Sequence, residues 1–212
     1  MAINSSGGVV TGALKNVRSY TGAGTYTYTV PSDVRYVKVF VTGGGGGGQG
    51  HEFNDSGASG GGGGTAIEFL DLNGVSSVTV TVGGGGTAGT NGNMNNSGDG
   101  GTSSFGTYCS GLGGEGPNYW GQGGRGGSAT GGMLNIRGCG GSDGNIDQGG
   151  TAFSNGPGGH SFWGYAENGQ TTWGTGIAPT DWGAGGAGGC SSGSKNAIAG
   201  AGGSVVIEEY YE

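Results

Sequence analysis

The sequence is poor in the residues that build most protein interiors. Leu, Ile, Val and Phe together supply only 32 of the 212 residues, which is too few for the interior of a conventional enzyme domain. Seven basic and 14 acidic side chains give a net charge of −7. The chain therefore has neither the basic surface that binds nucleic-acid phosphates nor the self-repulsion of a highly charged disordered protein, and we expect no nucleic-acid partner.

Long apolar runs are also missing. No stretch approaches the roughly 20 apolar residues that a membrane-spanning helix requires. The N-terminal residues have neither the basic n-region nor the apolar h-region of a secretory signal. We therefore expect no membrane insertion, and synthesis and folding in a cytoplasm.

Cysteine and histidine are scarce. The three cysteines, Cys109, Cys139 and Cys190, are odd in number and lack C-x-x-C spacing, which fits neither a full disulfide framework nor a zinc ribbon. We predict that they are small buried side chains in a reducing compartment. His51 and His160 each lack a second histidine nearby. We accordingly predict no metal site and no cofactor.

Glycine, in contrast, is abundant and unevenly distributed. The chain has 62 glycines, and they concentrate in residues 43–64 and 83–203. The glycine-poor blocks 1–42, 65–82 and 204–212 frame these two rich regions. The poor blocks predict β-strands, and no segment has a helical period of useful length.

The strand predictions rest on alternation with a period of two. Val37, Val39 and Val41 share one side of the chain, while Tyr36 and Phe40 share the other, which predicts a strand covered on both faces. Similar patterns give five expected strands, at residues 25–30, 34–41, 65–70, 75–82 and 204–211.

Two turns and the chain end complete the predicted module. Pro31-Ser32-Asp33 predicts a turn between the first two strands. Asn73-Gly74 predicts a hairpin between the third and fourth strands. The last strand, at residues 204–211, returns the chain to the sheet.

The glycine-rich regions predict an ordered array. A strict G-X-Y repeat is absent and only 4 prolines are present, which excludes collagen. Residues 83–203 hold all 4 tryptophans, an aromatic load that a flexible linker does not carry. Polyglycine type II helices have about three residues per turn and no internal hydrogen bonds, so packed neighbours can bond to one another where glycine leaves room.

We therefore predict a mostly β and irregular fold with essentially no α-helix. A small antiparallel β module frames a packed array of polyglycine type II helices. The predicted divisions are a leader or attachment segment at 1–20, the β module at 21–82 plus 204–212 with a glycine-rich insertion at 43–64, and the helix array with its loops at 83–203.

Three stretches carry a resemblance to a known family. They read LKNVRSYTGAGTYTYTVPSDVRYVKVFVTGGGGGGQG near the start, LNGVSSVTVTVGGGGTAG in the middle, and GAGGAGGCSSGSKNAIAGAGGSVVIEEYYE at the end. These stretches resemble glycine-rich C-terminal domains of tailed-bacteriophage tail fibres. More loosely, the chain is similar to the distal adhesins of T-even phages, which are sandwiches of polyglycine type II helices. Those adhesins have a sizeable N-terminal mounting domain, whose role we expect the leader 1–20 to take here.

The resemblance implies a receptor-binding protein without enzymatic activity. It implies a place at the tail-fibre tip of the virion, after assembly in the host cytoplasm, with other tail-fibre subunits as partners. The receptor would be an outer-membrane protein or glycan of a bacterium. Because the net charge is negative, a protein or neutral glycan is favoured over anionic lipopolysaccharide. A homotrimer and a single adhesin on a trimeric shaft both stay open.

The candidate receptor-binding residues lie in segments that interrupt the glycines. Flat aromatic rings stack on sugars or fill protein pockets at low entropic cost. The four tryptophans are divided between receptor contact and cover for the flanks of the array. The candidates are His51, Phe53, Asn54, Tyr119, Trp120, Phe162, Trp163, Tyr165, Trp173 and Trp182.

Other signatures are weak. Residues 57–61 match G-x-S-x-G, but the strand-to-helix elbow that a catalytic serine needs is not predicted there. Asp143, Asn145 and Asp147 resemble the start of a calcium loop, but Gln148 and Ser154 stand where glycine and glutamate are required. The alternative functions are a structural virion component without receptor binding and, more weakly, an ice-binding protein, for which no sustained threonine or alanine row exists.

Overall fold

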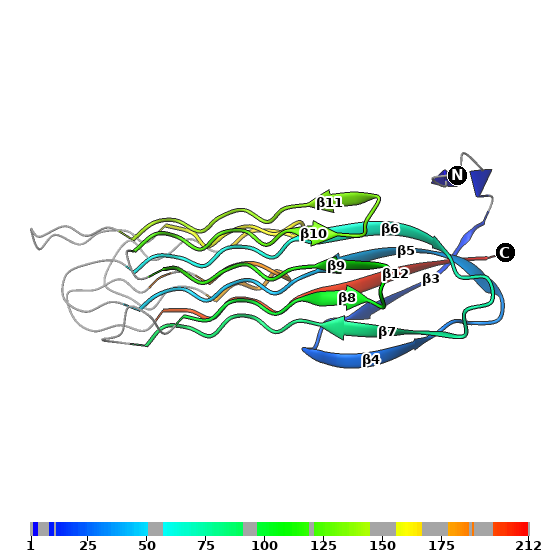
Figure 1. Cartoon of the computed structure of the whole chain (residues 1–212), viewed down its shortest axis with the longest axis horizontal. Coiled ribbons are helices and arrows are strands. Elements are labelled where there is room, and N and C mark those ends of the chain that lie inside the picture. Colours follow the sequence, from blue (N-terminus) through cyan, green and yellow to red (C-terminus); the bar gives the residue numbers. More distant parts are fainter. Residues whose placement is uncertain are drawn as a thin grey trace, which may run out of the picture.

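Strands gather at one end of the molecule, and glycine-rich segments run away from them to the other end (Figure 1). The computed structural model describes residues 2–3, 9–10, 12–50, 57–90, 97–118, 121–144, 156–166, 178–186, 188 and 197–211. The N and C labels both lie at the strand end (Figure 1). The described part of the chain contains no helix of the length and hydrophobicity that crossing a bilayer requires.

The strands form two five-stranded antiparallel sheets and one small hairpin. Sheet I has the order β10-β9-β8-β7-β4 and sheet II has the order β11-β6-β5-β12-β3, while β1 pairs with β2. The strands of sheet I are β4 (Gly24–Thr29), β7 (Ser77–Val82), β8 (Ser103–Phe105), β9 (Cys109–Gly111) and β10 (Ala129–Thr130). Those of sheet II are β3 (Leu14–Tyr20), β5 (Val34–Thr42), β6 (Thr65–Asp71), β11 (Leu134–Ile136) and β12 (Ser204–Tyr211). The hairpin consists of β1 (Ala2–Ile3) and β2 (Val9–Val10).

The hydrophobic core lies between the two sheets. Val37, Val39 and Val41 are fully buried on the inner face of β5, as the alternation predicts. Sheet I supplies Val78, Val80 and Val82 of β7, and Tyr28 of β4 contacts Phe105 of β8 with ring centroids 5.9 Å apart. The mostly β class is confirmed, and the residues that the structure describes contain no α-helix.

The two predicted turns connect sheets rather than neighbouring strands. β4 lies in sheet I and β5 in sheet II, and β6 lies in sheet II whereas β7 lies in sheet I. The expected hairpin at Asn73-Gly74 is therefore wrong, although Gly74 does adopt a turn conformation with φ of 78°. The physical reason is that β7, placed in the opposite sheet from β6, buries Val78, Val80 and Val82 in the core between the two sheets.

Strands also occur outside the expected β module. Leu14–Tyr20, expected to belong to the leader, forms edge strand β3 beside β12. The short strands β8 to β11 lie within the region expected to be the helix array. Sequence periodicity misses β3 because it is mostly exposed on both faces, and it misses the others because they have only two or three residues.

Hydrogen bonds between the glycine-rich segments repeat every three residues. Along segment 43–50, the N–H groups of Gly43 and Gly46 donate to segment 57–64, at Gly64 and Gly61. The intervening residues donate in the same rotation to segments 97–102 and 197–203. This period is that of a polyglycine type II helix, whose backbone groups point outward to its neighbours.

Segment 43–50 is surrounded on all sides. Its N–H groups bond to three antiparallel segments, and its carbonyl groups accept bonds from three parallel ones, as in a hexagonal lattice. Segment 57–64 is also enclosed by six segments, and its carbonyl groups accept bonds from the antiparallel segment 43–50 and from two parallel ones. The partners of segment 43–50 are 57–64, 97–102 and 197–203 as acceptors, and 83–90, 112–118 and 183–188 as donors.

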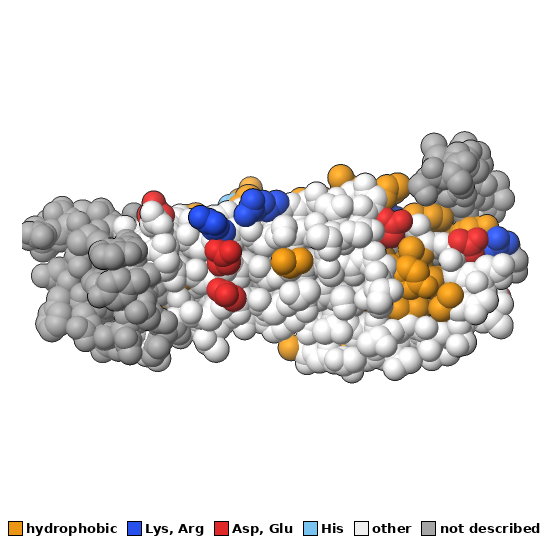
Figure 2. Space-filling view, in the orientation of Figure 1, with side chains coloured by type: hydrophobic (Ala, Val, Ile, Leu, Met, Phe, Trp, Pro, Cys, Tyr) orange, Lys and Arg blue, Asp and Glu red, His pale blue; other side chains and the backbone are white. Residues whose placement is uncertain are grey.

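Burial follows from this position in the lattice. Every residue of 43–50 and of 57–64 is buried. Segment 112–118 lies at the surface, and there only every third residue is exposed, at Leu112, Glu115 and Asn118. Charged side chains accordingly stand on the outside of the bundle (Figure 2). The two longest glycine runs, 43–48 and 60–64, thus lie in the central helices, whereas the shorter run 83–86 lies on an outer one.

Substitutions at Gly45 and Gly202 should differ sharply. A Cβ at Gly45 would lie 2.0 Å from the carbonyl oxygen of Ala184, whereas a Cβ at Gly202 would lie 3.8 Å from its nearest heavy atom. Because the enclosing backbone cannot move without breaking hydrogen bonds, we expect Gly45→Ala to cost more than about 3 kcal/mol or to prevent folding. Gly202→Ala should change stability by less than about 1 kcal/mol. Denaturant unfolding of both variants measures this, and equal losses would contradict the lattice.

Candidate functional site

The described glycine-rich segments end together, away from the sheets (Figure 1). Gly50 lies beside Thr90, Gly188 lies beside Gly57, and Ala197 donates to the carbonyl of Gly89 at 3.1 Å. We call this end, where the segments ending at Gly50, Thr90 and Asn118 lie together, the tip. Six candidates lie outside the described residues: His51, Phe53, Asn54, Tyr119 and Trp120 in stretches between segment ends at the tip, and Trp173 in the stretch between residues 166 and 178.

Side-chain amides and hydroxyls close the lattice near the tip. Gln49, only 1% exposed, donates to the carbonyl of Asn118 at 3.4 Å. Asn118 donates to Gln122 at 2.8 Å. The Ser59 hydroxyl, which belongs to the G-x-S-x-G match, is buried and donates to the carbonyl of Gly156. These bonds hold the segment ends together, and Ser59 lies in a central helix rather than at a strand-to-helix elbow.

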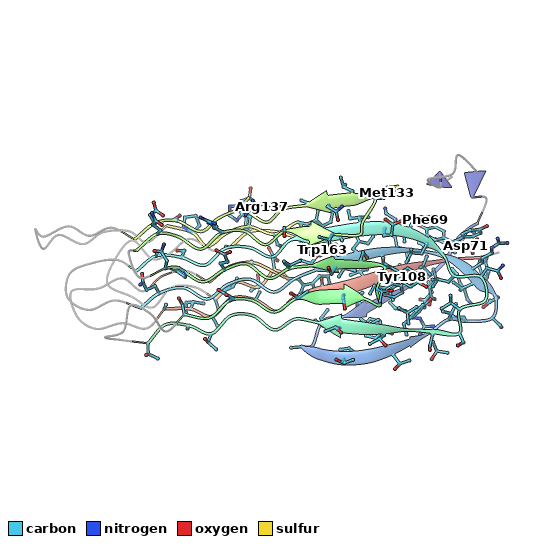
Figure 3. The ribbon with its side chains drawn as sticks, in the orientation of Figure 1. Phe69, Asp71, Tyr108, Met133, Arg137 and Trp163 are labelled. Atoms are coloured by element: carbon cyan, nitrogen blue, oxygen red, sulfur yellow. The ribbon has the colours of Figure 1, made fainter. Side chains whose placement is uncertain are left out.

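Three other candidates lie at the sheet end instead of the tip. Trp163 is seen beside the ends of the strands in Figure 3. Its indole N–H donates to the Thr42 hydroxyl at 2.9 Å, and its ring centroid lies 5.6 Å from that of Phe40. Trp182 packs edge-on against Trp163 at 5.4 Å, and Phe162 does so at 5.1 Å. We call Phe162, Trp163 and Trp182 the aromatic turn.

The aromatic turn covers the end of strand β5 at Phe40 and Thr42. Trp163 and Trp182 are half-buried, which corresponds to the covering role that the sequence left open for the tryptophans. Phe162 remains 43% exposed. Sequence reasoning could not place these residues, because the turn depends on Thr42, which lies 121 positions away along the chain from Trp163.

Tyr165 is the most exposed of the described candidates, at 74%. Its ring packs edge-on against His160 with centroids 4.7 Å apart, and its backbone N–H donates to the carboxylate of Asp181. The Nδ1 atom of His160 accepts a hydrogen bond from the backbone of Ala166. Both polar groups thus fix the backbone around Tyr165 and leave its ring open to solvent.

One buried charged group, which no sequence pattern marked, lies inside the sandwich. The carboxylate of Glu209 is fully buried and accepts hydrogen bonds from Arg18 at 2.6 Å and from the Tyr28 hydroxyl at 2.9 Å. The Glu209 carboxylate raises the pKa of Arg18. Burial, and then the bond to Glu209, raise the pKa of Tyr28. This group ties edge strand β3 to the core.

The other titratable candidates carry no reactive arrangement. Burial raises the pKa of Cys109 to about 12. Cys139 is exposed, so the prediction of a buried side chain is wrong for it, because it lies on an outer helix. Asp143, from the calcium-like stretch, accepts a bond from the backbone of Gly123. Among the described residues no group of three or more His, Cys, Asp or Glu side chains could hold a metal ion.

Comparison with known proteins identifies a family for this chain. A family model described as a glycine-rich domain matches residues 20–211. A search of curated proteins finds no match.

Alanine substitutions at Trp163 and Tyr165 should differ in their effect on the free energy of unfolding. Trp163→Ala removes a half-buried ring and its indole hydrogen bond to the Thr42 hydroxyl, so we expect a loss of about 2 kcal/mol or more. Tyr165→Ala removes a ring that is 74% exposed, and the loss should stay within about 0.5 kcal/mol. Urea unfolding followed by circular dichroism measures both. Similar losses in the two variants would show that the aromatic turn does not stabilise the sandwich.

Proposed function

The chain belongs to the glycine-rich domain family, and from that premise we propose that it is a receptor-binding adhesin of a tailed-bacteriophage tail-fibre tip. It recognises a bacterial outer-surface protein or glycan, performs no catalysis and is carried in the virion. The observation that carries the proposal is the one-ended arrangement of the array, in which the segment ends converge at the tip while both chain ends lie at the sheets.

The lattice makes the tip a rigid base. The backbone bonds of the two enclosed helices continue to Gln49 and Ala58, next to the residues at which the chain leaves the described part. Binding groups mounted on such a base lose little conformational entropy when a receptor docks. Rigidity of this kind supports recognition through the stretches that join the segment ends.

The lattice also leaves those stretches free in sequence. Its geometric demand for glycine applies to the helices, where an added Cβ would meet backbone atoms, as at Gly46 and Gly61. The joining stretches contain aromatic and amide side chains, among them Trp120 and Trp173. The helices require glycine at fixed positions, whereas the joining stretches can vary in sequence. Such a scaffold suits a protein whose binding specificity must change without loss of the fold.

The net charge restricts the partner. At −7 the chain is repelled over long distances by anionic polysaccharide, so attraction must come from short-range stacking and hydrogen bonding. A membrane protein loop or a neutral glycan supplies such contacts. The proposed partner is therefore one of these two classes.

Binding of a fluorescent fusion to a panel of bacterial strains tests the proposal. We expect strain-selective binding that falls about 30-fold or more in Trp120→Ala or Trp173→Ala, as for aromatic hot spots. Tyr26→Ala, at an exposed tyrosine of the sheet end, is the matched control and should bind normally. Circular dichroism of each variant confirms folding.

Two results would reject the proposal. One is a folded protein that binds none of the strains that the parent phage infects, which would favour a structural virion component. The other is binding that survives every aromatic substitution at the tip.

A further inference from the structure

The two outer faces of the sandwich differ in chemistry. On the outer face of sheet I, strand pairing places only serine and threonine, on all five strands. Thr25, Thr27 and Thr29 of β4 lie opposite Thr81, Thr79 and Ser77 of β7. The surface over β7, β8 and β9 is correspondingly almost free of coloured side chains (Figure 2). This is the polar face that a solvated antiparallel sheet normally has.

The outer face of sheet II is apolar. The same pairing places Val206, Phe40, Ile67 and Leu134 in one row across four strands. A second cluster joins the rings of Tyr36, Phe69 and Tyr210, whose neighbouring centroids lie 6.0 Å apart. The outer face of sheet I, made of serine and threonine, shows that this chain can form a sheet face suited to water. The apolar outer face of sheet II therefore needs an explanation of its own.

Only part of this face is covered by described residues. The aromatic turn packs over Phe40 at the end nearest the glycine-rich segments. Farther along, Val17 of β3 is 52% exposed and Leu134 of β11 is 51% exposed. The part of the face at Phe40 is covered by aromatic side chains of the same chain. The exposed part, which includes Val17 and Leu134, is also apolar and can bind apolar side chains in the same manner.

The centre of the face carries two opposite charges. Lys38 of β5 and Glu208 of β12 are directly opposed across the strands. Lys38 lies over the Phe40 ring at 4.7 Å, and Glu208 accepts a bond from the Tyr210 hydroxyl at 2.8 Å. Within the described part of the chain, neither charge takes part in a salt bridge. A face with one charge of each sign is complementary to a rotated copy of itself.

The area of the free part of this face suits a weak association. Five strands at about 4.8 Å spacing, with up to nine residues in a strand, give the whole face roughly 600 Å², and the part at Phe40, Ile67 and Val206 is already covered. Each partner in a standard protein interface contributes about 800 Å². The neutral face also avoids the repulsion that the net charge of −7 would impose on copies meeting elsewhere.

We propose that the outer face of sheet II is an interface between copies of this chain, with Lys38 of one copy beside Glu208 of the other. This association concerns the sheet end and leaves the tip of each copy free. It does not depend on the proposed receptor binding, and its test is separate from the cell-binding assay.

Size-exclusion chromatography with light scattering on the full chain tests the interface. The wild type should form dimers at micromolar concentrations. Val17→Asp should raise the dissociation constant at least about tenfold, because it buries a charge on the apolar face. Thr27→Asp introduces the same side chain on the outer face of sheet I and should leave the mass unchanged. A monomeric wild type, or equal effects of the two substitutions, would overturn the proposal.

A charge exchange identifies the occupant as a second copy. Lys38→Glu gives a face with two negative charges, and Glu208→Lys gives a face with two positive charges. Each variant alone should be monomeric, whereas an equal mixture should associate, provided that circular dichroism shows both folded. Failure of the mixture to associate would overturn the assignment of Lys38 and Glu208 as partners between copies.

Discussion

The structure depends on hydrogen bonds between the backbones of separate glycine-rich segments. Successive N–H groups of an enclosed helix donate to different neighbouring segments. These hydrogen bonds can form only because glycine has no Cβ to hold the neighbouring backbones apart. These bonds take the place of apolar side chains, whose buried cluster lies between the two sheets. A chain with so few large apolar residues can therefore be ordered over most of its described length.

The same constraint sorts side chains by position. The enclosed helices hold few side chains, such as those of Gln49, Ala58 and Ser59 near the tip. Most other side chains stand at every third position of an outer helix, in the sheets, or in the stretches between segments. Lateral faces of the array present rows such as Leu112, Glu115 and Asn118, whose neighbours Ser128, Arg125 and Gln122 lie opposite through backbone bonds. The two ends of the molecule are consequently where compact groups of larger side chains can form.

Sequence patterns predicted the parts governed by local rules. Alternation identified β5 and its inner valines, and the glycine runs indicated helices without internal hydrogen bonds. The patterns failed where distant segments decide the outcome. The turn at Asn73-Gly74 has hairpin chemistry, yet the need to bury both flanking strands sends the chain to the other sheet. The aromatic turn illustrates the same limit for the candidate site, because Trp163 finds its partner Thr42 only through the fold.

The sheets solve a problem that the array cannot solve alone. Ordering one residue of backbone costs about 1–2 kcal/mol, and glycine is the most expensive residue to order. Strand β5 runs directly into segment 43–50, and its sheet neighbours β6 and β12 are preceded by segments 57–64 and 197–203. Thr42 pairs with Thr65, and the next hydrogen bond, from Gly43 to Gly64, already belongs to the array. The sandwich thus sets the register in which the central helices start, so each further bond adds to an aligned lattice rather than nucleating a new one.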